Sequence, residues 1–262
     1  MTTLNIIDSN NWVRVKMEES LGGASIMNLW TDLMTTSNSG IQQLFVFDGY
    51  NSRQKRRSLY PEYKAKRKSA DQSFFDGLNF FKELLTYAPA NVQTVSVPEY
   101  EADDVIANIA YKWQSMYDKI NIISTDKDLT QLRTIPNVNT LATPKVDPKW
   151  VRLYKTFVGD SSDNIPGVHG FGDGAWNKTS DEWKDRMTVL FYLRKGNPEM
   201  DTVLRLCKKE GMSDKLLNKI RDTNLALWYK LVSFYKIDEQ IIIKTGNNNV
   251  SLAQEKLAEY EL

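Results

Sequence analysis

Apolar residues follow two different periods along the first half of the chain. Short runs of aliphatic and β-branched residues predict strands over residues 4–7, 43–47, 92–97 and 120–125. Apolar residues recur every three or four positions over residues 24–36, and the same helical spacing begins again at residue 101. Strands that alternate with helices are typical of a mainly parallel central sheet flanked by helices. The pattern therefore predicts an α/β fold for this part of the chain.

Acidic residues follow each predicted strand. The first strand leads into an aspartate and then a predicted turn at residues 9–11. The acids in this pattern are Asp8, Asp48, Glu101, Asp103, Asp104, Asp126 and Asp128. Because the carboxyl ends of parallel strands meet at one edge of a sheet, we expect these side chains to gather there. One aspartate after a strand is usually a turn former or a helix cap, but the recurrence after four strands indicates a pocket for a hard divalent cation.

The tetrapeptide of residues 101–104 places three carboxylates at the start of a predicted helix. Glu101 and Asp104 lie three residues apart, so they share one face of that helix. Acids at a helix N-terminus also complement the helix dipole, and this structural alternative stays open for the cluster by itself.

A strongly basic segment lies between the second and third predicted strands. Residues 51–70 contain one acid, Glu62, and the cations Arg53, Lys55, Arg56, Arg57, Lys64, Lys66, Arg67 and Lys68. A basic run is most often a solvated surface. Here Tyr60 and Tyr63 interrupt it, so the cations have the chemistry to hold phosphates while the rings stack on bases. The segment is polar and forms little core by itself, so we expect an arch or gate that orders when substrate binds.

The second half of the chain has a different character. A predicted helix over residues 149–157 is followed by a turn-rich loop that contains Asp160 and Asp163 three positions apart. The loop ends in glycines, Gly170 and Gly172 among them, which allow backbone amides to approach an anion closely. From residue 181 onward apolar residues recur at helical spacing, which predicts a helical region.

Composition narrows the chemistry. The chain has 262 residues and a formal net charge of +1, so any argument for a polyanionic partner has to be local. One cysteine excludes an internal disulfide framework, and one histidine excludes a site with several histidine ligands. The sequence shows neither an apolar run long enough to span a bilayer nor a signal peptide, so we expect a soluble, cytoplasmic protein with no membrane partner.

Taken together, the motifs resemble those of the 5′-nuclease superfamily, which includes flap endonucleases, small phage-encoded exonucleases and the N-terminal nuclease domain of bacterial DNA polymerase I. The resemblance covers residues 4 to about 175. The motifs that carry it are Ile7-Asp8, Val46-Phe47-Asp48-Gly49, Tyr60-Pro61-Glu62-Tyr63-Lys64-Ala65-Lys66-Arg67, Glu101-Ala102-Asp103-Asp104, Thr125-Asp126-Lys127-Asp128-Leu129 and Gly159-Asp160-Ser161-Ser162-Asp163-Asn164-Ile165-Pro166-Gly167-Val168.

The resemblance implies a PIN-like 5′-nuclease fold with a helical arch and a helix–hairpin–helix-like element in the C-terminal region. It assigns residues 1–150 to the nuclease core, with the arch at 51–75, and residues 151–262 to a helical region packed on that core. It implies that two or more Mg²⁺ or Mn²⁺ ions bind at Asp8, Asp48, Glu101, Asp103, Asp104, Asp126, Asp128, Asp160 and Asp163. Family members often hold a potassium ion at the glycine loop. In bacterial relatives that loop continues with a lysine and a threonine, whereas this chain continues Gly172-Asp173-Gly174-Ala175-Trp176-Asn177-Lys178, so the potassium site and the helix–hairpin–helix clamp stay open here.

Among the basic residues, Lys64 and Arg67 resemble the cationic pair beside the scissile phosphate, so they join the carboxylates as predicted catalytic residues. Arg56 resembles the upstream arginine of the family, and Tyr63 is a candidate for base stacking. The predicted nucleic-acid contacts are Arg53, Lys55, Arg56, Arg57, Tyr63, Lys64, Lys66, Arg67, Gly170, Gly172 and Lys178.

The function implied is metal-dependent hydrolysis of DNA or RNA–DNA phosphodiesters at a 5′ flap, nick or free 5′ end, leaving 5′-phosphate products. We expect a monomer acting in replication or repair, in the host cytoplasm if the protein is phage-encoded. A single-strand-binding protein and a polymerase are the candidate protein partners. Two alternatives stay open: a junction-binding module with weak or no turnover, and a primase- or topoisomerase-like metal site built from Glu101, Asp126 and Asp128.

Overall fold

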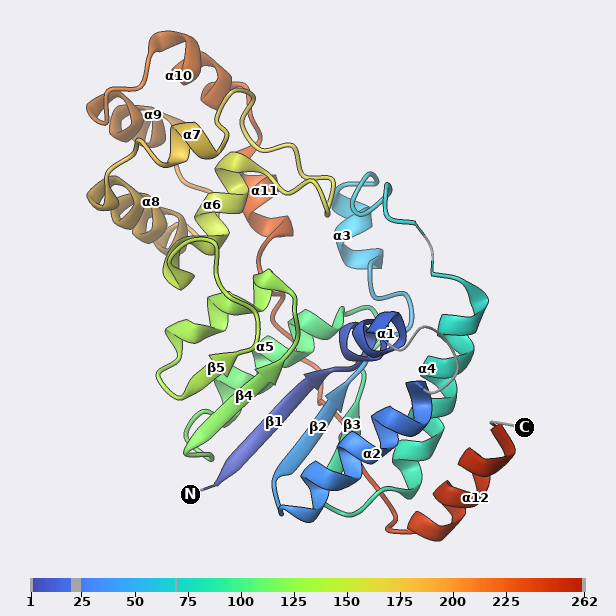
Figure 1. Ribbon diagram of the computed structural model, residues 1–262. Helices are drawn as coiled ribbons and strands as arrows, with labels where there is room; N and C mark the ends of the chain where they lie inside the picture. The colour runs from blue at the N-terminus through green and yellow to red at the C-terminus, as the bar shows by residue number, and fades with distance from the viewer. Residues whose placement is uncertain (1, 20–24, 69, 261–262) are drawn as a thin grey trace. The chain divides into compact units, whose positions relative to one another are not determined.

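The computed structural model describes residues 2–19, 25–68 and 70–260 (Figure 1). These residues form two compact units. The first comprises the described parts of residues 1–54, 69–143 and 235–262, and the second comprises residues 55–68 and 144–234. The segment at residues 55–68 therefore belongs to the same unit as residues 144–234, and the last part of the chain belongs to the first unit.

The first unit is built on a sheet in which six strands are described, in the order β5-β4-β1-β2-β3-β6. The strands are β1 (Thr3–Asp8), β2 (Gln42–Val46), β3 (Val92–Val95), β4 (Lys119–Ile123), β5 (Val138–Thr140) and β6 (Lys244–Thr245). All neighbours are parallel except β3 and β6. The predicted α/β fold with a mainly parallel sheet is confirmed, and the two short outer strands β5 and β6 were not predicted.

Helices flank both faces of this sheet. Those of the first unit are α1 (Ser9–Glu19), α2 (Ser25–Asn38), α4 (Gln72–Leu84), α5 (Ala102–Trp113) and α12 (Val250–Tyr260), with the short 3-10 helices η1 (Leu85–Tyr87) and η2 (Lys127–Thr134). The turn predicted at residues 9–11 is wrong, because α1 begins at Ser9 directly after β1. Helix α2 agrees with the helix predicted over residues 24–36 apart from residue 24, which lies outside the described residues.

Two apolar layers hold the helices against the sheet. On one face, Phe45 of β2 packs in a buried cluster that also contains residues of α1, α2, α4 and α12. The rings of Trp12, Phe45 and Phe81 lie within 5.7 Å of one another, centroid to centroid. On the other face, α5 packs against β1 and β2. Strands that are buried on both faces read as continuous apolar runs, and this explains why the sequence identified them.

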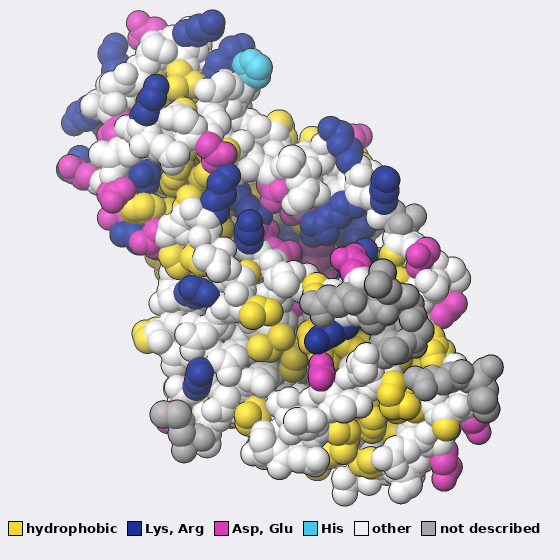
Figure 2. Space-filling model, viewed as in Figure 1, with side chains coloured by type: hydrophobic (Ala, Val, Ile, Leu, Met, Phe, Trp, Pro, Cys, Tyr) yellow, Lys and Arg dark blue, Asp and Glu magenta, His cyan; other side chains and the backbone are white. Residues whose placement is uncertain are grey.

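Part of the first unit's apolar surface remains exposed. Met27, Trp30, Met34 and Leu257 line a groove of about 470 Å³ whose walls come from α2 and α12. Hydrophobic side chains are visible at the surface near α2 (Figure 2). Across both units, no described helix has the length and apolar character that a membrane crossing requires.

The second unit is helical. Its elements are α3 (Gln54–Leu59, from Lys55 onward), η3 (Pro148–Trp150), α6 (Val151–Val158), α7 (Asp173–Trp176), α8 (Asp181–Leu193), α9 (Met200–Lys209), α10 (Asp214–Arg221) and α11 (Leu225–Leu231). Aromatic residues dominate its core, where Phe157 packs against the rings of Phe171, Trp183 and Phe191. The helical character predicted for residues after 181 is confirmed.

The basic segment of residues 55–68 is packed onto this second unit. Tyr63 belongs to a buried cluster with Ile165 and with Trp228, Leu231 and Val232 of the α11 region. Arg56 is buried and donates hydrogen bonds to the backbone oxygens of Leu231 and Ser233. The boundaries of the two units differ from the predicted division at residue 150, and the roles assigned to the predicted ranges stay predictions.

Candidate active site

The carboxyl edge of the sheet brings predicted acids of the first unit together. The register aligns Asp8 of β1 with Val46 of β2, and Ile7 with Ile123 of β4, so the three strands end at the same level (Figure 1). Asp48 lies two residues beyond β2, and Asp126 lies three residues beyond β4. Acids that are more than a hundred positions apart in sequence therefore surround one edge, as predicted.

Asp8 lies at the centre of this group. Its side chain is only 6% exposed, and it accepts hydrogen bonds from the backbone amide of Asn11 (3.2 Å) and the hydroxyl of Ser124 (2.9 Å). Burial, together with the negative charges of Asp48 and Asp126, raises the pKa of Asp8 to about 7 in spite of these two donors. An unneutralised carboxylate is therefore unfavourable here at neutral pH, and the pocket requires a proton or a cation.

The loop after β4 connects two of these carboxylates through one hydroxyl. Ser124 donates to Asp8, and the same oxygen accepts a hydrogen bond from the backbone amide of Asp126 at 3.1 Å. Asp126 then caps η2 by accepting from the amide of Asp128 at 2.8 Å. Within the described residues neither Asp8 nor Asp126 forms an ion pair with a lysine or arginine.

The acidic tetrapeptide caps α5. Glu101 and Asp104 form a reciprocal capping box at the helix start, and Asp48 accepts a hydrogen bond from the amide of Ala102 at 2.8 Å. Asp104 is fully buried and also accepts from the amide of Tyr235 at 2.7 Å, which ties the C-terminal segment to α5. The structural alternative, in which the acids cap the helix and complement its dipole, therefore explains part of the position of Asp104. Glu101 and Asp48 lie beside the carboxyl edge of the sheet.

The predicted acids of the second unit have cationic partners within that unit. Asp163 lies 2.7 Å from Arg67 and 3.9 Å from Lys64, and accepts a hydrogen bond from the hydroxyl of Tyr63 at 3.2 Å. Asp160 pairs with Lys155 at 2.5 Å. Burial opposes ionisation of Asp160, but the Lys155 ammonium and the hydrogen bonds from Ser162 outweigh it and lower the pKa of Asp160 to about 2. The pKa of Asp160 is therefore shifted in the opposite direction to that of Asp8.

Comparison with known proteins identifies the family. Residues 22–155, about half of the chain, match the model of the 5′-3′ exonuclease N-terminal resolvase-like domain. The chain belongs to this family.

Similarity to individual proteins supports this family assignment. The chain is 29% identical over 234 residues to the 5′-3′ exonuclease of Aquifex aeolicus, an alignment that covers 83% of this chain and 74% of that one. It is 32% identical over 155 residues to the thermostable DNA polymerase I of Thermus aquaticus, covering 55% of this chain and 18% of the polymerase. The chain thus spans about a fifth of the polymerase.

Solved structures show the same fold. The structure of T5 5′-exonuclease with bound divalent zinc ions aligns with a TM-score of 0.63 and 20% identity over 99% of this chain and all of that one. The catalytic core of Rad2 in complex with a DNA substrate aligns with a TM-score of 0.56 and 14% identity over 98% of this chain and 87% of that one. These findings confirm the predicted 5′-nuclease resemblance, the α/β 5′-nuclease fold and the nuclease class of the protein, while the helix–hairpin–helix-like element stays a prediction.

Several residues predicted to contact nucleic acid have structural contacts in this member of the exonuclease family. Tyr63 is only 2% exposed, which argues against the predicted stacking role because its ring is enclosed by the α11 region. Lys64 is also buried, with a positive φ of 54° and an amide that donates to the backbone oxygen of Asp163. The exposed cations of this segment that were predicted to bind phosphate are Arg57, Lys66 and Arg67.

The glycine loop divides into structural and accessible positions. Gly159 and Gly167 both have positive φ, and a Cβ at either would lie within 2.6 Å of backbone atoms. Gly170 and Gly172 are exposed and have open space around them, so their backbone is accessible, as is Lys178. The structural requirement for glycine is therefore strongest at two positions that the prediction did not select.

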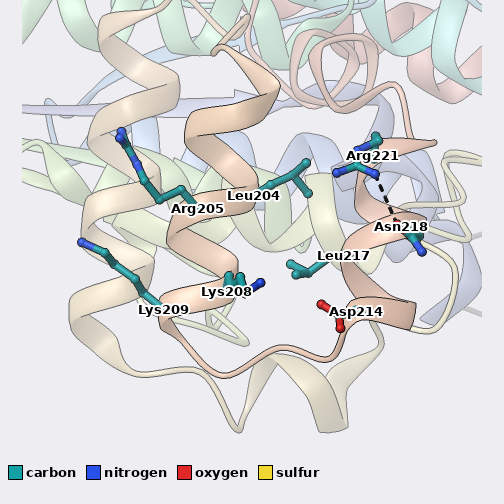
Figure 3. A pocket seen from close by; sticks show the side chains of 8 residues that line it. All are labelled: Leu204, Arg205, Lys208, Lys209, Asp214, Leu217, Asn218 and Arg221. Atoms are coloured by element: carbon teal, nitrogen blue, oxygen red, sulfur yellow. Dashed lines mark hydrogen bonds between the residues drawn. The ribbon is translucent and has the colours of Figure 1, made fainter.

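A separate cleft of about 510 Å³ lies between α9 and α10. Figure 3 shows Leu204 and Leu217 pointing toward one another across it, while Arg205 and Lys209 point away from its centre. The lining contains none of the acids predicted to bind metal, so this cleft is not the predicted active site.

Sequence reasoning missed three polar residues that organise the carboxylates. Ser124 connects Asp8 to Asp126. Asn10 accepts from the amide of Asp48 at 3.3 Å, and Asn11 bonds to both the amide and the hydroxyl of Thr125. The available signal was their position directly after strands, at the same edge as the acids.

Proposed function

We propose that the protein is a divalent-metal-dependent 5′ nuclease that hydrolyses phosphodiesters in DNA near a 5′ end or a 5′ flap. The observation that carries this proposal is the carboxylate pocket around Asp8, in a chain of the 5′-3′ exonuclease family. Two structural neighbours, a complex of the T5 D15 flap endonuclease with DNA and metal ions and the DNA complex of Rad2, support DNA as the substrate class.

The donor set fits a hard divalent cation. Asp8, Asp48 and Asp126 offer carboxylate oxygens only, which is the ligand type that Mg²⁺ and Mn²⁺ prefer. The raised pKa of Asp8 supports a cation here, because burial and the neighbouring carboxylates make a further negative charge unfavourable. We propose Mg²⁺ or Mn²⁺ as the ion, held by these three carboxylates with Glu101, Asp103 and Asp128 as further ligands.

When bound, such ions lower the pKa of a water molecule and stabilise charge on the attacking and leaving oxygens. The residues of the chain perform the remaining tasks. Ser124 and Asn11 orient the oxygens of Asp8 toward the pocket by donating to both of them. A metal-dependent mechanism of this kind needs no histidine or serine nucleophile. The single histidine of the chain is consistent with it.

Cations of the basic segment are proposed to hold the substrate phosphates. Asp163 accepts from Arg67 and lies beside Lys64, so it restrains both side chains before substrate arrives. Arg67 is partly exposed, so a phosphoryl oxygen has access to its guanidinium, which suits charge-assisted hydrogen bonds to phosphate. RNA primers as substrates, and a polymerase or single-strand-binding protein as partner in the cytoplasm, are further parts of this proposal.

Cleavage of a 5′-labelled flap duplex tests the proposal. Wild-type protein should release a short labelled product with Mg²⁺ or Mn²⁺ and none with a chelator, and Asp8→Asn should lower the single-turnover rate by at least a hundredfold. Asp76→Asn, which changes an exposed acid of α4, is the matched control and should cleave like the wild type.

Equal product with metal and with chelator would refute the metal mechanism. Tight binding of the flap without cleavage under any divalent ion would favour the junction-binding alternative.

A further inference from the structure

Tyr50 is the most exposed large aromatic residue among those described. Its side chain is 81% exposed, and within the described part of the chain its ring and hydroxyl make no hydrogen bond or ring contact. It lies two residues beyond Asp48, at the carboxyl end of β2. An exposed tyrosine alone is common on protein surfaces, so its significance depends on how it is held.

The backbone around Tyr50 is tightly fixed to the loop before α5. The oxygen of Tyr50 accepts from the amide of Glu99 at 2.7 Å, and the amide of Gly49 donates to the oxygen of Tyr100 at 3.0 Å. One step further toward the sheet, Asp48 accepts from the amide of Ala102. The three consecutive residues 48–50 are therefore bonded to residues 99, 100 and 102, and this pairing connects the two carboxylate-bearing loops at Tyr50.

This arrangement carries local strain. Asn51, directly after Tyr50, and Glu99, whose amide bonds to Tyr50, both have positive φ, at 53° and 65°. Gly49 approaches the other loop so closely that a Cβ would lie 1.8 Å from the oxygen of Val97. Strained backbone that surrounding contacts maintain occurs frequently at binding and catalytic sites.

We propose that Tyr50 is a substrate-positioning residue whose ring stacks on a nucleobase next to the phosphodiester at the carboxylate pocket. The inference rests on the proposed nuclease function. Stacking on an aromatic ring tolerates every base, so it suits an enzyme that recognises a strand end or a junction and not a sequence. The rigid backbone keeps the ring near Asp48 without any support from its own side-chain contacts.

This role replaces the one predicted for Tyr63. Both tyrosines adjoin the predicted motifs, but one ring is enclosed and the other is open to solvent. A stacking surface has to be accessible before the substrate binds, so only Tyr50 satisfies the requirement.

The first experiment measures stacking without cleavage. Flap duplexes carrying 2-aminopurine at successive positions around the cleavage site are titrated with protein in chelator, where fluorescence reports stacking of the probe. Wild-type protein should change the fluorescence at one position, Tyr50→Phe should retain that change, and Tyr50→Ala should lose it. Tyr192→Ala, which removes a ring that is 73% exposed on α8, is the matched control and should behave like the wild type.

The second experiment tests whether the effect of removing the Tyr50 ring depends on the presence of the stacked base. An abasic site at the stacked position should lower kcat/KM of the wild type by about tenfold, within the range expected for the loss of one base–aromatic stack. Tyr50→Ala should show a similar loss on the intact substrate and little further loss on the abasic one. Equal sensitivity of wild type and Tyr50→Ala to abasic sites at every position would overturn the inference while leaving the nuclease proposal intact. Absence of cleavage by the wild type refutes the proposed function, and absence of any position-dependent fluorescence change refutes the stacking role.

Discussion

Replacement of Asp8 by asparagine should stabilise the metal-free protein at alkaline pH although it should lower the cleavage rate. Asparagine removes the negative charge and keeps the shape of the side chain. Asp8 is buried beside Asp48 and Asp126, and its pKa is raised from 3.8 to about 7. A shift of about three pKa units corresponds to about 4 kcal/mol of unfavourable free energy for the ionised form.

The sign of the pH dependence follows from the same shift. Because the folded-state pKa of Asp8 lies above the unfolded value, its contribution to stability is fully present below pH ~4 and is lost as the pH rises through about 7. The metal-free wild type should therefore lose up to about 4 kcal/mol from this group between those limits. Asp8→Asn should lack this component, so at pH 8 it should exceed the wild type by about 2–3 kcal/mol once the loss of about one hydrogen bond is subtracted.

Thermal and urea unfolding in chelator at pH 5 and pH 8 measure the difference, followed by the same measurements with added Mg²⁺. Added metal should stabilise the wild type at pH 8 and have little effect on Asp8→Asn, because binding to the folded state alone raises stability. If Asp8→Asn were less stable than the wild type at pH 8 in chelator, the charge repulsion inferred for this pocket would be wrong. Equal stabilisation of both proteins by Mg²⁺ would place the ion elsewhere.

Three further predictions concern the second unit. Asp163→Asn removes the carboxylate that faces the buried Lys64 ammonium and pairs with Arg67, so it should lower the free energy of unfolding by about 1.5–3 kcal/mol. Asp185→Asn, in a pair whose side chains are both about half exposed, should change it by less than about 1 kcal/mol; urea titration checks both. Gly159→Ala should lower the melting temperature by several degrees, because φ is 92° and the new Cβ would lie 2.6 Å from a backbone oxygen; an unchanged melting curve would contradict this. Burial raises the pKa of the Cys207 thiol to about 12, so a thiol reagent at pH 8 should label it only after denaturation, and rapid labelling of the native protein would show that the site opens.

Much of the first unit was predictable because its signals are local. The apolar runs ending at Asp8 and Asp48 mark strands by themselves, and the parallel alternation of strands and helices determines that their ends share one edge. The helix start at Glu101 was predictable for the same reason, since a capping box lies within four consecutive residues. The helix directly after Asp8 was not, because its first residues favour turns and only packing against the sheet stabilises α1.

Local sequence patterns did not predict the contacts between distant segments. The burial of Tyr63 depends on Ile165 and on the α11 region, more than a hundred positions away. Ser124 gained its role only when β4 was placed beside β1, which brought its hydroxyl to Asp8.

The sequence by itself determined the strands, the acids at their ends and the family to which they belong, because periodicity and short motifs are encoded within a few consecutive residues. The tertiary structure alone decided which of two similar tyrosines is accessible and which acids have cationic partners. Accessibility and pKa depend on everything within a few ångströms of an atom, and only folding determines which atoms those are.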